Sequence, residues 1–100
     1  MAKAYWVAQV DVTEPEGYKA YTGADMPAFR KYGGRFLVRG GQSQLLEGAV
    51  RSRTVVIEFP DLAAAVACYH SPEYQGAAAL RKGRAVFDLI AIEGYEGEQP

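Results

Sequence analysis

The run of short strand and helix signals in residues 54–83 constrains the fold of this chain more than any other feature. Its first part, Thr-Val-Val-Ile-Glu-Phe at 54–59, is β-branched and aromatic and predicts a strand. Pro60 ends this strand, because proline has no N–H to donate to a sheet ladder. Asp61 then predicts the N-cap of a short helix from Leu62, since its carboxylate can accept from the free N–H groups of the first turn.

A second helix start follows at Ser71, Pro72 and Glu73. These residues combine a hydroxyl cap, a proline that fits the first turn and a carboxylate near the positive helix end. Gly83 is expected to cap the far end of this helix. The segment therefore predicts a strand followed by two helices that meet at an angle.

The beginning of the chain predicts the same order of elements. Residues 4–12 alternate as a strand does, with Trp6 and Val10 on the face expected to enter the core. Thr13 and Glu16 then predict a capping box, in which each side chain accepts a hydrogen bond from the backbone N–H of the other residue. A helix is expected to begin here.

This helix carries an inward stripe that combines phenols with one carboxylate. Pro27 removes a backbone donor and clashes with the preceding turn, so a kink or break is expected near Asp25. Gly33 and Gly34 are expected to end the helix in a left-handed cap. Taken at about 100° per residue, the stripe consists of Tyr18, Tyr21, Asp25, Phe29 and Tyr32.

Residues 35–39 predict the next strand. Regular alternation puts Phe36 and Val38 on one face of the strand. The other face carries Arg35, Leu37 and Arg39. Gly40 then permits a bend or a bulge. Arg39 is therefore expected on the face opposite Phe36.

Two further strands are expected, one before and one after residues 54–83 in the sequence. Residues 42–47 are expected to pair with the strand after Arg53 as a hairpin, with its tip at 48–52. The last strand is expected at 84–94, and 96–100 is a polar tail.

These elements predict an α+β protein with the order βαββαβ. Two right-handed β-α-β connections put the first and third strands in the middle of a four-stranded antiparallel sheet, with the helices on one face. Residues 1–95 are expected to form one domain. The other face of the sheet is too apolar for solvent and too charged for a dry core, so a homodimer of stacked sheets is predicted. That face collects Tyr5, Val7, Gln9, Leu37, Arg39, Val56, Glu58, Asp88, Ile90 and Ile92.

The chain resembles a family of small bacterial proteins known as domain of unknown function thirteen-thirty. Two runs carry the resemblance, VVIEFPDLAAAVACYHSPEYQGAAALR and the earlier YGGRFLVRGG, and it extends over nearly the whole chain. It implies a ferredoxin-like βαββαβ fold that pairs into a dimeric α/β barrel. It implies no established activity.

Composition excludes several classes of partner. A hydrophobic fraction of 49% with 23% charged residues is typical of a globular protein, and a net charge of -1 provides no field to attract phosphates. Nucleic acid is therefore not an expected partner. The longest apolar run, at 62–69, is far shorter than the roughly 20 residues of a membrane span, so no membrane partner is expected either.

The single cysteine and the N-terminal segment favour the cytoplasm. Cys68 has no second cysteine with which to form an intrachain disulfide. The apolar run after Lys3 is interrupted by Gln9 and Asp11, which does not resemble a signal peptide. No metal-ligand spacing or cofactor-binding motif occurs in the sequence, so neither a metal nor a cofactor is expected.

The candidate site is an aromatic and polar set, in which the phenols orient a small planar ligand. Asp25 and His70 are the candidate catalytic residues, because His70 can exchange a proton at neutral pH and Asp25 can orient it or act as the base. Three structural alternatives remain. Asp25 can instead cap the half-helix that restarts at Pro27, the tyrosines can be core residues with their hydroxyls at the rim, and His70 can lie in solvent. The candidate ligand-binding residues are Tyr18, Tyr21, Tyr69 and Arg39.

The arginines near the expected hairpin have two interpretations. They can converge to bind a carboxylate or phosphate, or they can form ion pairs with acidic residues on neighbouring strands or across the dimer. The four are Arg35, Arg39, Arg51 and Arg53, and the acidic candidates are Glu47, Glu58 and Asp88.

Three classes of function follow. The first is a homodimer that binds a small aromatic or acidic metabolite in a cleft between sheet and helices. The second, by analogy with other dimeric α/β barrels, is a cofactor-independent oxygenase or isomerase. The third is a structural or protein-interaction module without a ligand.

Overall fold

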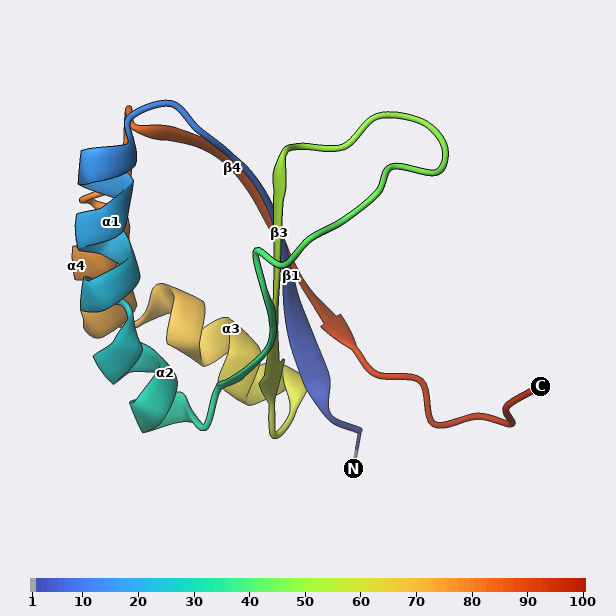
Figure 1. Ribbon diagram of the computed structural model, residues 1–100. Coiled ribbons are helices and arrows are strands. Elements are labelled where there is room, and N and C mark those ends of the chain that lie inside the picture. The colour runs from blue at the N-terminus through green and yellow to red at the C-terminus, as the bar shows by residue number, and fades with distance from the viewer. Residues whose placement is uncertain (1) are drawn as a thin grey trace.

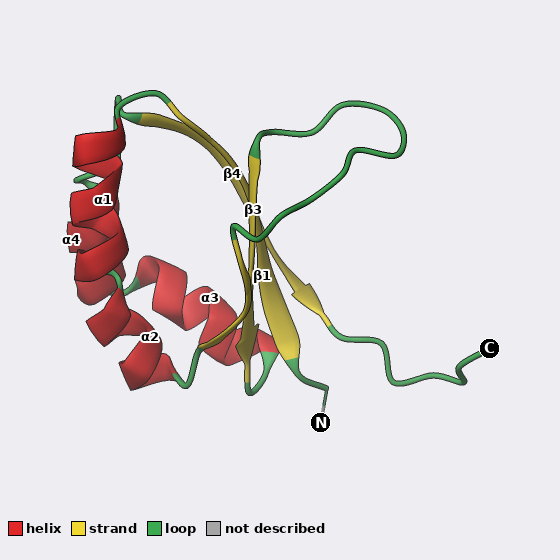
Figure 2. Ribbon diagram, in the orientation of Figure 1, coloured by secondary structure: helices red, strands yellow, loops and turns green. Residues whose placement is uncertain are grey.

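The computed structural model describes residues 2–100 and contains one four-stranded antiparallel sheet with four helices. The strand order is β2-β3-β1-β4, which confirms that the first and third strands lie in the middle. All four helices cover one face of the sheet, while the loop after β2 and the C-terminal segment project away from the helices (Figures 1 and 2). The elements are β1 (Ala4–Val12), α1 (Pro15–Ala24), α2 (Met26–Tyr32), β2 (Arg35–Arg39), β3 (Arg53–Phe59), α3 (Leu62–His70), α4 (Pro72–Ala78) and β4 (Ala85–Glu93).

The core lies between the sheet and the helices and is centred on Trp6. Its ring packs against Phe29 of α2, Phe59 of β3 and Tyr74 of α4, with ring centroids 5.4, 5.3 and 4.9 Å apart. The indole N–H also donates to the carbonyl of Ala65 in α3 at 2.8 Å. One side chain therefore ties three of the helices to the central strands.

The predicted caps of α3 and α4 are confirmed. The carboxylate of Asp61 accepts from the backbone N–H of Ala64 at 2.7 Å, and the hydroxyl of Ser71 accepts from that of Tyr74 at 3.1 Å. The predicted end of the second helix is wrong, because α4 ends at Ala78 and a series of turns follows before β4. Gly83 lies in these turns with φ at +77°.

The predicted capping box at the start of α1 does not form. The N-cap is Glu14, and no side chain bonds the first turn. Instead, the backbone N–H groups of Thr13 and Glu14 donate to the carbonyl of Arg84 at 2.9 and 3.0 Å. The carbonyl of Arg84, just before β4, thus satisfies the two N–H groups that precede α1.

A bulge in β2 reverses the predicted faces of its last two residues. Phe36 pairs with Ile57, but the register shifts at Leu37, so that Val38 pairs with Val56 and Arg39 with Val55. Val55 is a core residue, and Arg39 therefore lies on the helix side of the sheet. The expectation that Arg39 belongs to the open face is wrong, and Val38 lies there instead.

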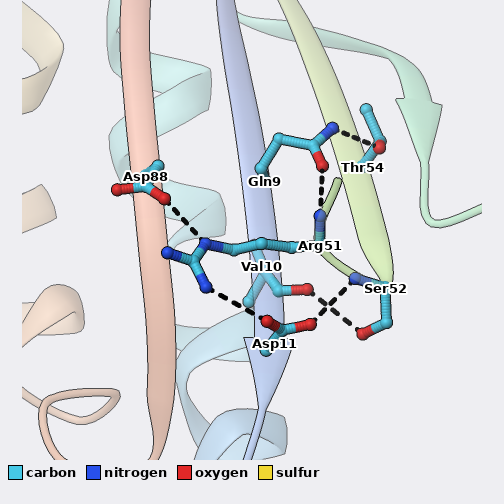
Figure 3. Close-up of polar contacts among 7 residues, drawn as sticks. All are labelled: Gln9, Val10, Asp11, Arg51, Ser52, Thr54 and Asp88. Carbon is cyan, nitrogen blue, oxygen red and sulfur yellow. Dashed lines mark hydrogen bonds and ion pairs between the residues drawn. The ribbon is translucent and has the colours of Figure 1, made fainter. Parts of the chain in front are cut away.

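The predicted hairpin of residues 42–47 does not form, because β2 itself pairs with β3 and residues 40–52 make an extended loop. The end of this loop is bound to the open face of the sheet (Figure 3). The guanidinium of Arg51 contacts Asp88 at 2.6 Å and Asp11 at 3.1 Å, and the N–H of Ser52 donates to Asp11 at 2.8 Å. These contacts hold the C-terminal end of the loop, at Arg51 and Ser52, against the sheet.

The open face of the sheet is apolar at its centre and on β4. Tyr5 and Val7 of β1 are half-buried, whereas Ile90 and Ile92 of β4 are 56% and 50% exposed. No helix within residues 2–100 has the length and apolar character needed to cross a lipid bilayer.

Candidate functional site

The structure distributes the predicted site residues over two cavities on the helix side of the sheet. Both are lined by Trp6 and Phe87. The first, which we call the inner cavity, has a volume of about 20 Å³ and is lined by Trp6, Ala8, Tyr18, Tyr21, Thr22, Asp25, Phe29, Phe36, Arg39, Arg53, Val55, Ile57 and Phe87. The second, which we call the outer cleft, has about 450 Å³ and is lined by Trp6, Val66, Tyr69, His70, Arg81, Phe87, Asp88, Leu89 and Ala91.

Asp25 is the buried carboxyl of the inner cavity. It lies where α1 gives way to α2, as Pro27 predicts, and it is only 4% exposed. Its side chain makes no capping hydrogen bond, and its Oδ1 has no partner within residues 2–100. The interpretation of Asp25 as a helix cap is therefore not supported. Burial raises the pKa of this carboxyl to about 7, while the charge of Arg39 acts in the opposite direction.

Two arginines accompany Asp25 in the inner cavity. Arg39 stacks on Phe36 at 4.4 Å, and its Nη2 donates to the carbonyl of Thr22 at 3.4 Å. Arg53 lies over the ring of Tyr18 at 5.8 Å, and its Nε is buried without a partner in the described chain. Aromatic rings thus hold both guanidinium groups, and neither forms an ion pair within residues 2–100.

The phenols of the predicted site are mostly packed into the core. Tyr18 and Tyr21 are 7% and 4% exposed. The Oη atoms of Tyr21 and Tyr74 are 2.8 Å apart, and Arg81 donates to Tyr74 Oη at 3.2 Å. Burial raises the pKa of both Tyr21 and Tyr74, so these hydroxyl groups stay neutral and act as hydrogen-bonding groups.

The outer cleft combines aromatic walls with one cation. Tyr69 and His70 lie exposed at the end of α3, with their rings 5.2 Å apart. Tyr69 also packs edge-on against Trp6 at 6.2 Å. Across the cleft, the half-buried guanidinium of Arg81 lies 3.9 Å from the ring centroid of Phe87, and its Nε has no partner in the described chain.

Arg81 is not among the candidate site residues named from the sequence, although the helical pattern places it on one face with Tyr74. Its spacing was a usable signal, because Arg81 follows Tyr74 by seven positions, which is about two helical turns. Such spacing brings a cation and a phenol to one side of a helix. The turns after α4 preserve that proximity.

Asp25 and His70 do not share a cavity. Asp25 lines the inner cavity and His70 the outer cleft, and no hydrogen bond joins them among the described residues. The hypothesis that Asp25 orients His70 is therefore not supported. Of the candidate ligand-binding residues, Tyr18, Tyr21 and Arg39 line the inner cavity, whereas Tyr69 lines the outer cleft.

The four arginines near the loop do not converge. Arg51 forms an ion pair with Asp88 on the open face, as the second interpretation of these residues predicts, and a further one with Asp11, which that interpretation did not include. Only Arg39 and Arg53 line one cavity.

Cys68 and the acidic residues form no reactive or metal-binding group. Burial raises the pKa of the Cys68 thiol to about 12, so the side chain is a small buried hydrophobe. No cluster of three His, Cys, Asp or Glu side chains that could hold a metal ion occurs in residues 2–100.

The order of the elements and of the strands is that of a small α+β protein with a ferredoxin-like fold. More particularly, the chain belongs to the family described as Domain of unknown function (DUF1330), which it matches over residues 3–95. The family resemblance noted in the sequence is thereby confirmed.

Solved structures show the same fold. A protein of unknown function from Rhodopseudomonas palustris is 22% identical, with a TM-score of 0.76 over 96% of this chain and 85% of that chain. SnoaB, a cofactor-independent oxygenase from Streptomyces nogalater, is 14% identical, with a TM-score of 0.61 over 100% and 97%. An uncharacterised NIPSNAP domain protein from Burkholderia xenovorans is 14% identical, with a TM-score of 0.54 over 100% of both chains. No curated protein matches the chain.

Proposed function

We propose that the protein binds a small aromatic acid in the outer cleft. The observation that carries this proposal is the guanidinium of Arg81, which lies half-buried in the cleft without a carboxylate partner in residues 2–100. Removing a cation from water is costly unless an anion compensates it. A ligand carboxylate supplies that anion, and it suits the planar, forked donors of arginine.

The size and walls of the cleft fit such a ligand. Small-molecule sites typically enclose about 300–1,000 Å³, and the outer cleft has about 450 Å³. Trp6, Tyr69 and Phe87 supply aromatic surface around Arg81. Aromatic rings favour edge-to-face or offset contact with a planar ligand. The carboxylate then binds at Arg81 while the ring of the ligand packs against these side chains.

Calorimetric titration with benzoate tests the proposal. We expect the wild-type protein to bind benzoate, and Arg81→Gln to weaken binding by about tenfold or more, because a charge-assisted pair contributes roughly 1.5–3 kcal/mol. Lys82→Gln is the matched control, since it removes the same charge from the exposed neighbouring residue. Failure of the wild-type protein to bind benzoate, or equal affinity in Arg81→Gln and wild type, would contradict the proposal.

A second candidate function is cofactor-independent oxygenase or isomerase chemistry in the same cleft. It is favoured by His70, whose exposed imidazole lies next to Tyr69 in the lining of the cleft and is the side chain most often used as a general acid or base. A panel of quinones and lactones is its test, with His70→Asn as the variant. This function is supported if the wild-type protein turns over one of these compounds and His70→Asn does so more slowly. Equal turnover in the wild-type protein and in His70→Asn eliminates the proton-transfer role of His70.

We also propose that a second copy of the chain covers the open face of the sheet. The support is the apolar surface left there, where Val38, Ile90 and Ile92 are 41%, 56% and 50% exposed. Surfaces of this kind mark association sites in folded proteins. The loop of residues 40–52 projects on the same side and carries the strongly exposed Leu46 (Figure 1). Two sheets that stack face to face remove both apolar surfaces from water.

A further inference from the structure

The inner cavity contains a set of charges that the structure leaves unpaired. Asp25, Arg39 and Arg53 all line it, yet no ion pair joins any of them within residues 2–100. We propose that the inner cavity is a second binding site, which takes a small oxyanion between the two guanidinium groups and the buried carboxyl of Asp25. This site is separate from the outer cleft, because Arg81 does not line it.

The two arginines form a like-charge pair on neighbouring strands. Arg39 lies opposite Val55 in the β2–β3 ladder, and Arg53 precedes Val55 by two residues, so the two arginines share the helix side of the sheet. The Cα atoms of diagonal neighbours of this kind are roughly 7–8 Å apart. Arg39 is exposed and Arg53 is half-buried, and an oxyanion that reaches both cations offsets their mutual repulsion. A carboxylate-sized oxyanion can span two guanidinium groups.

Asp25 supplies the third contact. Its Oδ1 is buried and without a partner in the described chain, in a residue that is 96% buried. The adjoining volume of about 20 Å³ is enough for one water-sized group, since a water needs at least about 10–15 Å³. One oxygen of the anion fits this space. An ionised Asp25 repels it, whereas a protonated Asp25 donates a hydrogen bond to it.

The phenols of Tyr21 and Tyr74 and the thiol of Cys68 stay neutral beside Asp25. Burial raises the pKa values of the two phenols Tyr21 and Tyr74 and of the thiol of Cys68. Burial raises the pKa of Asp25 itself to about 7. The charged and titratable groups that face Asp25 or share its cavity are Tyr18 and Tyr21 from α1, Arg39 from β2, Arg53 from β3, Cys68 from α3 and Tyr74 from α4. Anion binding is therefore coupled to one proton, on Asp25.

Titration of the full chain with formate tests this inference. Because only the protonated form accepts the anion, we expect about tenfold tighter binding near pH 6 than near pH 8. Calorimetry in two buffers of different ionisation enthalpy is expected to show uptake of about one proton per formate near pH 8. Absence of formate binding near pH 6, or equal affinity at both pH values, would overturn the inference.

Variants locate the formate. Asp25→Asn is expected to bind formate with equal affinity at both pH values, and Arg39→Gln and Arg53→Gln are each expected to weaken binding by about tenfold. Arg30→Gln is the charge-matched control, because Arg30 is exposed on α2. Circular dichroism of each variant reports its folding. Formate binding that persists in Arg39→Gln and Arg53→Gln but disappears in Arg81→Gln would place the anion in the outer cleft and refute the second site.

Discussion

The phenol oxygens of Tyr21 and Tyr74, which are 53 positions apart in the chain, lie 2.8 Å from each other in the buried core. This hydrogen bond joins α1 to α4, and their rings also meet edge to face at 6.1 Å. Arg81 donates to Tyr74 from the lining of the outer cleft, while Tyr21 lines the inner cavity. The pair therefore forms part of the wall that separates the two cavities.

Tyr21→Phe is expected to destabilise the fold by about 1 kcal/mol, because the variant loses one buried hydrogen bond but keeps the ring packing. Urea unfolding measures this change. Tyr95→Phe is the control, since Tyr95 is 72% exposed in the C-terminal segment. A double-mutant cycle with Tyr74→Phe is expected to show coupling between the two hydroxyl groups. Strictly additive losses would mean that the two hydroxyls do not interact.

Asp25 is expected to make the protein less stable as the pH rises from about 4 to about 7. Its folded pKa of about 7 lies above its usual value of 3.8, so the folded state holds the proton that the unfolded state has already released. The stabilisation is complete below the unfolded pKa and is lost as the pH passes through the folded pKa. Between about pH 5 and pH 8 the loss is of order 2 kcal/mol.

Urea unfolding of Asp25→Asn at the same two pH values isolates this contribution. The amide cannot ionise, so the variant is expected to lack that share of the pH dependence and to be the more stable protein near pH 8. Asp61→Asn provides a comparison, because Asp61 is half-buried and caps α3. Identical pH slopes for Asp25→Asn and wild type would show that Asp25 titrates normally.

Arg39→Gln is expected to raise the pKa of Asp25. The positive charge of Arg39 lowers that pKa in the folded protein, so its removal further disfavours the carboxylate. Carbon-detected NMR of the Asp25 carboxyl across a pH titration measures the change, and Arg30→Gln is again the matched control. A pKa that stays constant in Arg39→Gln would mean that Arg39 points to the open face, as regular alternation in β2 predicts.

Local signals in the sequence predicted most of the fold. The caps at Asp61 and Ser71, the break at Asp25 and the position of Trp6 in the core all depend on a few neighbouring residues. The strand order followed from the handedness of two connections. These features are confirmed because short-range chemistry or a general topological rule determines them.

The features that the sequence did not predict depend on contacts between distant segments. The bulge at Leu37 arises from how β2 pairs with β3, and it moves Arg39 to the other face of the sheet. The capping box expected at the start of α1 does not form, and the N–H groups of Thr13 and Glu14 donate to the backbone of Arg84 instead. The candidate residues line two cavities, and Trp6 and Phe87 line both of them. Spacing along the chain contains no signal for any of these contacts.

The proposed pairing of two sheets predicts a dimer that a single charge disrupts. Ile90→Asp places a carboxylate in the apolar part of the open face on β4. We therefore expect wild type to sediment with twice the mass of one chain and Ile90→Asp with the mass of one. Leu80→Asp is the control, because Leu80 is 37% exposed in the turns after α4, away from β4. A monomeric wild-type protein at micromolar concentration would contradict the pairing.

The most direct test of the central claim, that the outer cleft is the ligand site, is an amide NMR titration of the wild-type protein with benzoate. We predict that the largest chemical-shift changes fall on residues around the outer cleft, including Tyr69, His70, Arg81 and Phe87. Changes confined to the open face of the sheet, or no changes at millimolar benzoate, would contradict the claim.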